Sequence, residues 1–274
     1  MIPTFQVLLD GTLLPAASAT VPATSEGFLY GHGIFETVKI LGGRPAFLAQ
    51  HHARLTASAH ALDLDCAIDL PSLRDRLHRV ITANALSDGS AKIVLFNNGD
   101  ATSELITTKA NPYPVEAYTR GFRLKTVFTG ERTGVLTAYK TLNYLANIRA
   151  KRAALATGFD EALFITPAGI VIEGATTNIF AVRDGMVFTP PLASGPLPGI
   201  ARAEVLALLG PDRARETLLT TSDLHHASEI FVTNALLGIM PVSRLDERVL
   251  NLNHFPVTQT LISSYKLREI QSLS

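Results

Sequence analysis

Lys140 is the residue whose position is most suggestive of chemistry. It follows the strand-like run VLTAY and precedes a predicted helix, with Asn143 and Tyr144 within the next turn. An amine at such a boundary could serve as a covalent nucleophile, although a lysine there is more often a solvated charge. The position alone leaves both interpretations open.

An acid and a glycine-proline loop are the next candidates. Glu173 ends the apolar run IVIEG, and it could be a buried acid that meets a ligand or an exposed carboxylate at a strand end. In the run GPLPGIAR, Gly199 precedes a predicted helix whose N–H groups and dipole would favour an anion such as phosphate. An ordinary loop is the alternative. Arg54, on an earlier predicted helix, is unremarkable when it is considered alone.

Several other kinds of site are missing from the sequence. It contains no GxGxxG, GxxxxGK[ST], HExxH or GxSxG motif. The adjacent pairs His51-His52 and His225-His226 would point their side chains apart on a helix, so we expect no metal site. The single cysteine, Cys66, can form neither an internal disulfide nor a Cys-rich metal site, which suits a reducing compartment.

The elements that must position these residues fall into two groups. The first is an α+β unit with a hairpin around Asp10-Gly11, strands over 34–41 and 91–96, and helices over 48–62 and 70–85. The run ANPYPVEA, at 110–117, predicts a linker. The second group has a strand over 124–128, a helix over 143–157, a block of short strands, a helix over 200–209 and strands from 230 to 242. We therefore expect domains at 1–115 and 116–274, the second barrel-like or sandwich-like, with a ligand at their junction.

Composition narrows the class of protein. The 274 residues are 47% hydrophobic and 18% charged, which excludes a disordered chain. Lysines and arginines equal aspartates and glutamates at 24 each, so no global field draws the protein to nucleic acid or to anionic lipid. The N-terminus does not resemble a secretory signal, and no apolar run approaches the ~20 residues of a membrane span. We expect a soluble, cytoplasmic protein that acts on a small molecule.

Five motifs in one order resemble the fold-type IV, class IV aminotransferase family. They are YGHGIFETVKILGGRPAFLAQHHARL (30–55), YKTLNYL (139–145), DEALFITPAGIVIEGATTNIF (160–180), GPLPGIAR (195–202) and IFVTNALLGIMPV (230–242). The resemblance implies a two-domain α+β fold like that of D-amino acid aminotransferases, with a small N-terminal α/β domain and a β-barrel-like C-terminal domain that carries the cofactor lysine. It also implies the cofactor pyridoxal 5′-phosphate (PLP) and a homodimer in which each active site is built partly by the neighbouring subunit.

The resemblance also implies roles for individual residues. Lys140 would form the imine with PLP, Glu173 would pair with the pyridine nitrogen, and Arg54 would contact the phosphate. The further residues implied to bind the cofactor are Tyr144, Thr177, Asn178, Gly199, Ile200, Ala201, Asn234 and Ala235.

Departures from the aminotransferase pattern favour one branch of the family. Ala201 and Ala235 stand where aminotransferases usually have hydroxyl residues, so backbone N–H groups would have to supply those phosphate contacts. Thr37 resembles the threonine that handles protons beside the lysine in 4-amino-4-deoxychorismate lyases. After the run AKIVLF, the sequence Asn97-Asn98-Gly99-Asp100 lacks the Arg-x-His pair that holds the substrate carboxylate in D-amino acid enzymes. His32 stands where an acidic residue is common, and the sequence offers no account of it.

The resemblance therefore implies a lyase that converts 4-amino-4-deoxychorismate to 4-aminobenzoate and pyruvate, in folate biosynthesis, with Lys140 and Thr37 as its catalytic residues. An aminotransferase that acts on D- or branched-chain amino acids, with 2-oxoglutarate as acceptor, is the alternative. A PLP-binding protein without catalysis is a third reading, which the intact Lys140 and Glu173 disfavour.

Overall fold

The computed structural model describes residues 5–130 and 135–273 and divides them into two compact units. The first comprises the described residues up to Pro112, the segment Tyr139–Asn143 and the residues from Glu269 on. The second comprises Tyr113–Ala138 and Tyr144–Arg268. Lys140 thus packs with the first unit, whereas the sequence-based division at 115 and 116 assigned it to the C-terminal domain.

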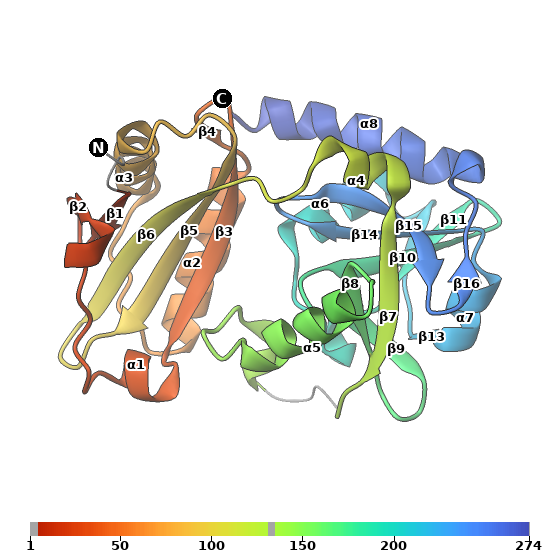
Figure 1. The fold of residues 1–274 in the computed structure, drawn as a ribbon, viewed down its shortest axis with the longest axis horizontal. Helices are drawn as coiled ribbons and strands as arrows, with labels where there is room; N and C mark the ends of the chain where they lie inside the picture. Colours follow the sequence, from red (N-terminus) through yellow and green to blue (C-terminus); the bar gives the residue numbers. More distant parts are fainter. Residues whose placement is uncertain (1–4, 131–134, 274) are drawn as a thin grey trace. The chain divides into compact units, whose positions relative to one another are not determined.

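A six-stranded antiparallel sheet forms the first unit (Figure 1). Its order is β2-β1-β6-β5-β3-β4. The bounds are Gln6–Leu9 (β1), Thr12–Pro15 (β2), Gly33–Leu41 (β3), Arg44–Pro45 (β4), Gly89–Asn97 (β5) and Thr102–Ala110 (β6). The predicted hairpin and the strands over 34–41 and 91–96 are confirmed by β1, β2, β3 and β5.

Two helices cover one face of this sheet. They are α2 (Leu48–Ala61) and α3 (Leu70–Ala83), each within two residues of its predicted bounds. Alternate residues of β3, among them Ile34 and Val38, pack against both helices in a continuous apolar core. Phe35 and Thr37 consequently lie on the opposite face. The short helices η1 (Ala16–Ser18) and α1 (Glu26–Tyr30) precede β3.

A longer sheet forms the second unit, with the order β12-β11-β10-β14-β15-β7-β8-β9-β13. Its strands are Phe122–Phe128 (β7), Glu161–Ile165 (β8), Ile170–Gly174 (β9), Asn178–Arg183 (β10), Met186–Thr189 (β11), Ala214–Glu216 (β12), Leu219–Thr220 (β13), Glu229–Asn234 (β14) and Gly238–Leu245 (β15), and β16 (Arg248–Val249) pairs with β15. The pairs β11–β12, β15–β7 and β7–β8 are parallel, and the others are antiparallel. Phe180 and Phe231, both fully buried, stack with ring centroids 4.8 Å apart.

Helices complete the second unit. They are α4 (Val115–Arg120), α5 (Leu145–Ala156), α6 (Ile200–Leu209), α7 (Thr221–His226) and α8 (Pro256–Gln271), with η2 (Val135–Ala138), η3 (Leu192–Ser194) and η4 (Leu252–His254) between them. The last residues of α8, from Glu269 on, belong to the first unit. The buried Glu229 accepts hydrogen bonds from the N–H groups of Val257 and Thr258, at 3.0 and 2.7 Å, which places a negative charge at the N-terminus of α8.

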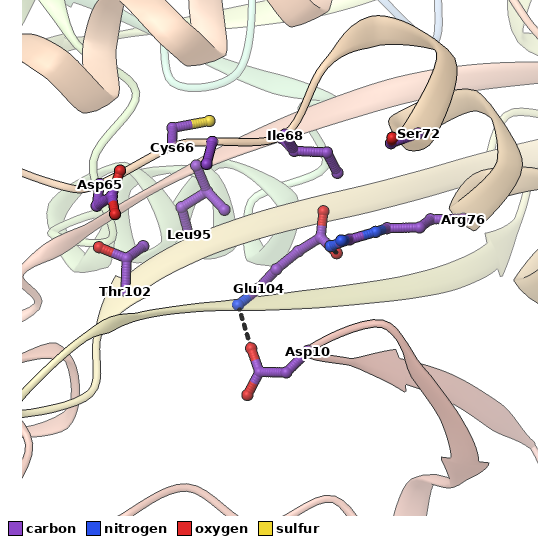
Figure 2. A pocket seen from close by; sticks show the side chains of 10 residues that line it. Asp10, Asp65, Cys66, Ile68, Ser72, Arg76, Leu95, Thr102 and Glu104 are labelled. Atoms are coloured by element: carbon purple, nitrogen blue, oxygen red, sulfur yellow. Dashed lines mark hydrogen bonds and ion pairs between the residues drawn. The ribbon is translucent and has the colours of Figure 1, made fainter.

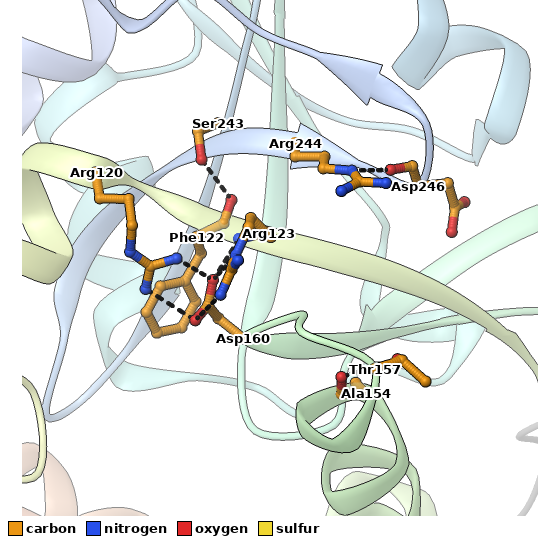
Figure 3. A network of polar contacts seen from close by, with 9 residues as sticks. All are labelled: Arg120, Phe122, Arg123, Ala154, Thr157, Asp160, Ser243, Arg244 and Asp246. Atoms are coloured by element: carbon orange, nitrogen blue, oxygen red, sulfur yellow. Dashed lines mark hydrogen bonds and ion pairs between the residues drawn. The ribbon is translucent and has the colours of Figure 1, made fainter.

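One carboxylate ties three elements of the second unit together (Figure 3). Asp160, just before β8, accepts hydrogen bonds from both terminal nitrogens of Arg120, at 2.8 Å, and from Nε of Arg123, at 3.0 Å. Burial alone would raise the pKa of Asp160, but the hydrogen bonds from both arginines lower it to about 2. The ion pairs join the end of α4 and the start of β7 to β8.

Two sequence-based assignments need correction. The run VLTAY before Lys140 is not a strand, because Val135–Ala138 form the 3-10 helix η2. The linker predicted over 110–117 is shorter, since α4 already begins at Val115. In the part of the chain that the structure describes, no helix is long and apolar enough to cross a membrane.

Candidate cofactor-binding site

Backbone contacts fix the segment that carries Lys140 against β3. The N–H of Phe35 donates to the carbonyl of Lys140 at 2.8 Å, and the N–H of Leu142 donates to the carbonyl of Gly33 at 2.9 Å. A Cβ at Gly33 would lie 2.6 Å from Cδ1 of Leu142 and 2.7 Å from the carbonyl oxygen of Leu95. Glycine at position 33 therefore permits the close approach that holds Lys140 beside the strand.

Thr37 and a second lysine, Lys92, share the sheet face that α2 and α3 leave uncovered, and Lys140 lies beside Phe35 on that face. The Nζ of Lys140 lies 4.4 Å from the ring centroid of Phe35, and the Nζ of Lys92 lies 4.3 Å from the same centroid. Lys92 on β5 pairs directly with Thr37 on β3, so their side chains share this face. Partial burial lowers the pKa of Lys92, and the charge of Lys109 lowers it further.

Sequence reasoning did not select Lys92. The signal was present, because a lysine interrupts the otherwise apolar run AKIVLF. Strand pairing was needed to show which face it shares, and a single strand contains no such information.

Arg54 is held by a buried carboxylate on the other side of β3. Its Nε and one terminal nitrogen donate to the two oxygens of Glu36, both at 2.7 Å, and Nδ1 of His51 lies 2.7 Å from Oε2 of Glu36. Burial alone would raise the pKa of Glu36, but the hydrogen bonds from His51 and Arg54 and the charge of Arg54 lower it to about 2. The guanidinium is thereby fixed in orientation, and its contact with the cofactor phosphate stays a prediction.

His32 has a local explanation. Its Nδ1 lies 2.9 Å from Oε2 of Glu26 and its Nε2 lies 2.8 Å from the carbonyl oxygen of Leu62. The hydrogen bond with Leu62 raises the pKa of His32, and the carboxylate of Glu26 raises it further. The histidine thus connects α1 to the end of α2.

The second unit contains the other predicted residues, and among them Glu173 is a buried acid. Its side chain on β9 is 6% exposed, and Oε2 accepts a hydrogen bond from the N–H of Leu197 at 2.9 Å. The alternative interpretation, an exposed carboxylate at a strand end, is therefore wrong. A buried carboxylate fixed by a backbone N–H is a suitable partner for a protonated ring nitrogen.

The polar turn between β9 and β10 gathers three more predicted residues. Tyr144 donates from its hydroxyl to the carbonyl of Ala175 at 3.1 Å, and Asn234 donates from Nδ2 to the carbonyl of Thr176 at 3.1 Å. The hydroxyl of Thr177 is buried and, among the described residues, has no hydrogen-bond partner. A buried hydroxyl without a partner is costly, so a polar ligand atom would satisfy it.

The N-terminus of α6 has no side-chain cap among the described residues. Gly199 is its N-cap residue. Ile200 and Ala201, whose N–H groups belong to the first turn, are 8% and 1% exposed. A Cβ on Gly199 would lie 2.0 Å from Oδ1 of Asn178, whose amide donates to the carbonyl of Leu197 at 2.9 Å. A buried, uncapped helix N-terminus suits an anion, as a phosphate group requires.

These features fit PLP within the second unit. Glu173 supplies an acid for the pyridine nitrogen, and the first turn of α6 and the hydroxyl of Thr177 supply donors for an anion. Asn234 accepts hydrogen bonds through Oδ1 from the N–H groups of Leu236 and Leu237, at 2.9 and 2.8 Å, which fixes the turn that contains Ala235. Thr37, Arg54 and Lys140 belong to the first unit, and their convergence on the same cofactor stays a prediction.

Comparisons with known proteins agree with this chemistry. The amino-transferase class IV family profile matches residues 33–245. A protein of Methanocaldococcus jannaschii, provisionally named a branched-chain-amino-acid aminotransferase, is 33% identical over 90% of both chains. The branched-chain aminotransferase of Thermoproteus uzoniensis, solved with norvaline, has a TM-score of 0.86 at 29% identity, over 96% of this chain and 93% of its own. A structure from Legionella pneumophila, provisionally named a 4-amino-4-deoxychorismate lyase, has a TM-score of 0.84 at 28% identity, over 93% and 97%.

Proposed function

We propose that this chain, which belongs to the PLP-dependent class IV aminotransferase family, is a 4-amino-4-deoxychorismate lyase. It would convert its substrate to 4-aminobenzoate and pyruvate without an amino acceptor, in folate biosynthesis. The observation that carries the proposal is the sheet face on which Thr37 and Lys92 pair directly and Lys140 lies beside Phe35. This face offers a base, a hydroxyl and a second cation.

The second cation suits the substrate of the lyase. 4-Amino-4-deoxychorismate carries two carboxylates, one on its ring and one on the enolpyruvyl group that leaves. Asn97, Asn98 and Gly99 provide no arginine at the end of β5, so the charge must come from elsewhere. Lys92, five residues before Asn97, can bind a carboxylate on the face that also bears Thr37.

The chain's own residues then divide the work. PLP, when bound, withdraws electrons from the carbon next to the substrate nitrogen. The amine of Lys140 removes the proton from that carbon, and the hydroxyl of Thr37 is positioned to relay a proton on the same face. Glu173 keeps a proton on the pyridine nitrogen. Cleavage of the ring C–O bond releases the enolpyruvyl group, which takes up a proton to become pyruvate, and the ring becomes aromatic. Alanine and leucine have no such leaving group.

An aminotransferase is the second candidate function. The relative from Methanocaldococcus jannaschii and the structure from Thermoproteus uzoniensis both have names that favour it. Such an enzyme would use the same cofactor residues, with the substrate pocket adapted to a D- or branched-chain amino acid. Thr37 discriminates the two candidates, because transamination of alanine or leucine releases no enolpyruvyl group and therefore needs no proton relay for it. A site for a second carboxylate does not discriminate them, since 2-oxoglutarate also carries two carboxylates.

Direct assay of the purified, PLP-loaded protein tests the proposal. We expect 4-aminobenzoate and pyruvate from aminodeoxychorismate alone, and no comparable rate with D-alanine or L-leucine plus 2-oxoglutarate. The Lys140→Ala variant should be inactive, and borohydride reduction of the wild type should label the peptide that contains Lys140. Transamination without lyase turnover would contradict the function, and a label on Lys125 or Lys151 would contradict the site.

A further inference from the structure

A polar pocket in the first unit is unrelated to the residues assigned to the cofactor. Its volume is about 320 Å³, at the lower end of small-molecule sites. It opens between the sheet, the N-terminal half of α3 and the segment that joins α2 to α3 (Figure 2). The lining residues are Asp10, Asp65, Cys66, Ala67, Ile68, Ser72, Arg76, Leu95, Thr102 and Glu104.

Glu104 lines this pocket, and one of its carboxylate oxygens lacks a hydrogen-bond donor among the described residues. Its side chain on β6 is 6% exposed, and Oε2 accepts a hydrogen bond from Nη1 of Arg76 at 2.7 Å. The other oxygen, Oε1, is buried and has no hydrogen-bond partner among the described residues. A buried carboxylate oxygen without a donor is destabilising, so a donor in the pocket would be stabilising.

The charged residues of the lining indicate that the ligand which supplies this donor is a cation. Asp10, Asp65 and Glu104 bring three carboxylates, whereas Arg76 is the single basic residue of the lining. Asp10 is held in place, since it accepts hydrogen bonds from the N–H of Glu104 at 2.8 Å and from the hydroxyl of Ser103 at 3.1 Å. The pKa of Glu104 is raised above its ordinary value, because burial and the charge of Asp10 outweigh the hydrogen bond and the charge of Arg76. The single guanidinium of Arg76 therefore cannot balance the three carboxylates of the lining.

The rest of the lining limits what kind of cation fits. Ile68 and Leu95 present apolar side chains beside the carboxylates (Figure 2). In the part of the chain that the structure describes, no group of three His, Cys, Asp or Glu side chains is arranged to hold a metal ion. A hydrated metal ion would also gain nothing from the apolar wall. A small organic cation matches both parts of the lining.

We propose that this pocket binds a small organic ammonium or amidinium ion with at least one N–H, donated to Oε1 of Glu104, and a short apolar body against Ile68 and Leu95. The assignment does not depend on which reaction the enzyme catalyses. Its ligand class is set by the incomplete carboxylate, the acidic lining and the apolar wall together.

Two matched probes test the hydrogen bond itself. N-Methylpyrrolidinium has one N–H, whereas N,N-dimethylpyrrolidinium has the same charge and a similar body without an N–H. Neither is a primary amine, so neither can form an imine with PLP. Calorimetric titration of the PLP-loaded enzyme at constant ionic strength should show saturable binding of the first probe and about tenfold weaker binding of the second, as expected for loss of a charge-assisted hydrogen bond.

Three variants localise the effect. Glu104→Gln should weaken binding of N-methylpyrrolidinium by at least about tenfold. Asp65→Asn changes an exposed residue of the lining and should weaken binding less, and Asp88→Asn, an exposed carboxylate outside the pocket, should leave it unchanged. Because Asp65 is exposed, its variant keeps the test valid if Glu104→Gln fails to fold. Absence of saturable binding, equal affinity for the two probes, or equal affinity of the Asp65 and Asp88 variants would overturn the proposal and leave a water-filled pocket only.

Discussion

At the scale of single residues, two lysine side chains next to one aromatic ring determine which ligand groups can bind at this face of the first sheet. The Nζ atoms of Lys140 and Lys92 both lie within 4.4 Å of the ring centroid of Phe35. The aromatic face stabilises a cation at Lys92 without neutralising it. A carboxylate that approaches this face of the sheet therefore meets positive charge.

Lys92 gives the first prediction at this scale. Lys92→Gln should raise KM for aminodeoxychorismate by about 10- to 100-fold, the range expected when one charge-assisted hydrogen bond is lost. Lys92→Arg should retain most of the affinity, because it restores the cation. Steady-state kinetics of pyruvate release measure both. If Lys92→Gln has the wild-type KM for aminodeoxychorismate, Lys92 does not bind the second carboxylate.

Glu36 gives a prediction about pH. Its pKa in the folded protein is about 2, below the ordinary value of 4.5, because His51 and Arg54 stabilise the ionised form more than burial destabilises it. A depressed carboxyl pKa contributes stability that is complete above about pH 4.5 and is lost as the pH falls towards 2. Glu36→Gln should therefore lower the free energy of unfolding by about 3–5 kcal/mol at pH 7, as removal of one partner of a buried ion pair does.

Denaturant unfolding at several pH values tests this expectation. The difference between wild type and Glu36→Gln should shrink as the pH falls through this window. Glu26→Gln is the control, because Glu26 pairs with a histidine but is 55% exposed, and it should cost at most about 1 kcal/mol. A difference that stays constant from pH 7 to pH 3 would show that the cost is steric and not electrostatic.

At the scale of elements, the sequence predicted those with a clear local signal. β3 is rich in β-branched residues and the apolar residues of α2 repeat at three to four residues, and both were placed within two residues. β6 was not predicted, because TSELITTKA mixes threonine and charged residues on both faces and becomes a strand through its pairing with β5 and β1. α8 was not predicted either, since its apolar residues do not gather on one side of the helix.

The same limit applies to the site. Motif order was sufficient to select Lys140, Glu173 and Gly199, but not to show whether Glu173 is buried. Burial depends on the loop that brings the N–H of Leu197 to its carboxylate, and that loop lies more than twenty residues away in the sequence. Long-range contacts of this kind leave no local pattern.

The N-terminus of α6 gives the prediction at this scale. Gly199→Ala would put a Cβ 2.0 Å from Oδ1 of Asn178, so the loop must shift and the first turn of the helix would lose its position. If this turn holds the phosphate of PLP, the variant should lose affinity for PLP by about tenfold or more and affinity for pyridoxal much less. Equilibrium dialysis of the apoenzyme measures both. Gly130→Ala is the control, because a Cβ at that position meets nothing within 4 Å. An equal loss of affinity for both ligands would place the phosphate elsewhere.

At the scale of the whole molecule, charge and exposed apolar surface bear on assembly. The formal net charge is zero at pH 7, so long-range repulsion does not oppose association of two copies. The short helix α1 exposes Phe28, Leu29 and Tyr30 by 68%, 52% and 71%. Three adjacent large apolar side chains at this exposure are typical of a surface that another chain covers.

We expect the protein to be a homodimer with α1 in its interface. Light scattering at micromolar concentration should give about 59 kDa, twice the chain mass of 29.4 kDa. Phe28→Glu should shift the mass towards that of the monomer, because a charge buried in an apolar interface without a partner is costly. Leu267→Glu is the matched control, since Leu267 on α8 is similarly exposed, at 64%, and should leave the dimer intact. A wild-type particle of 29.4 kDa would refute the dimer, whereas a dimer that both variants leave unchanged would refute only the role of α1.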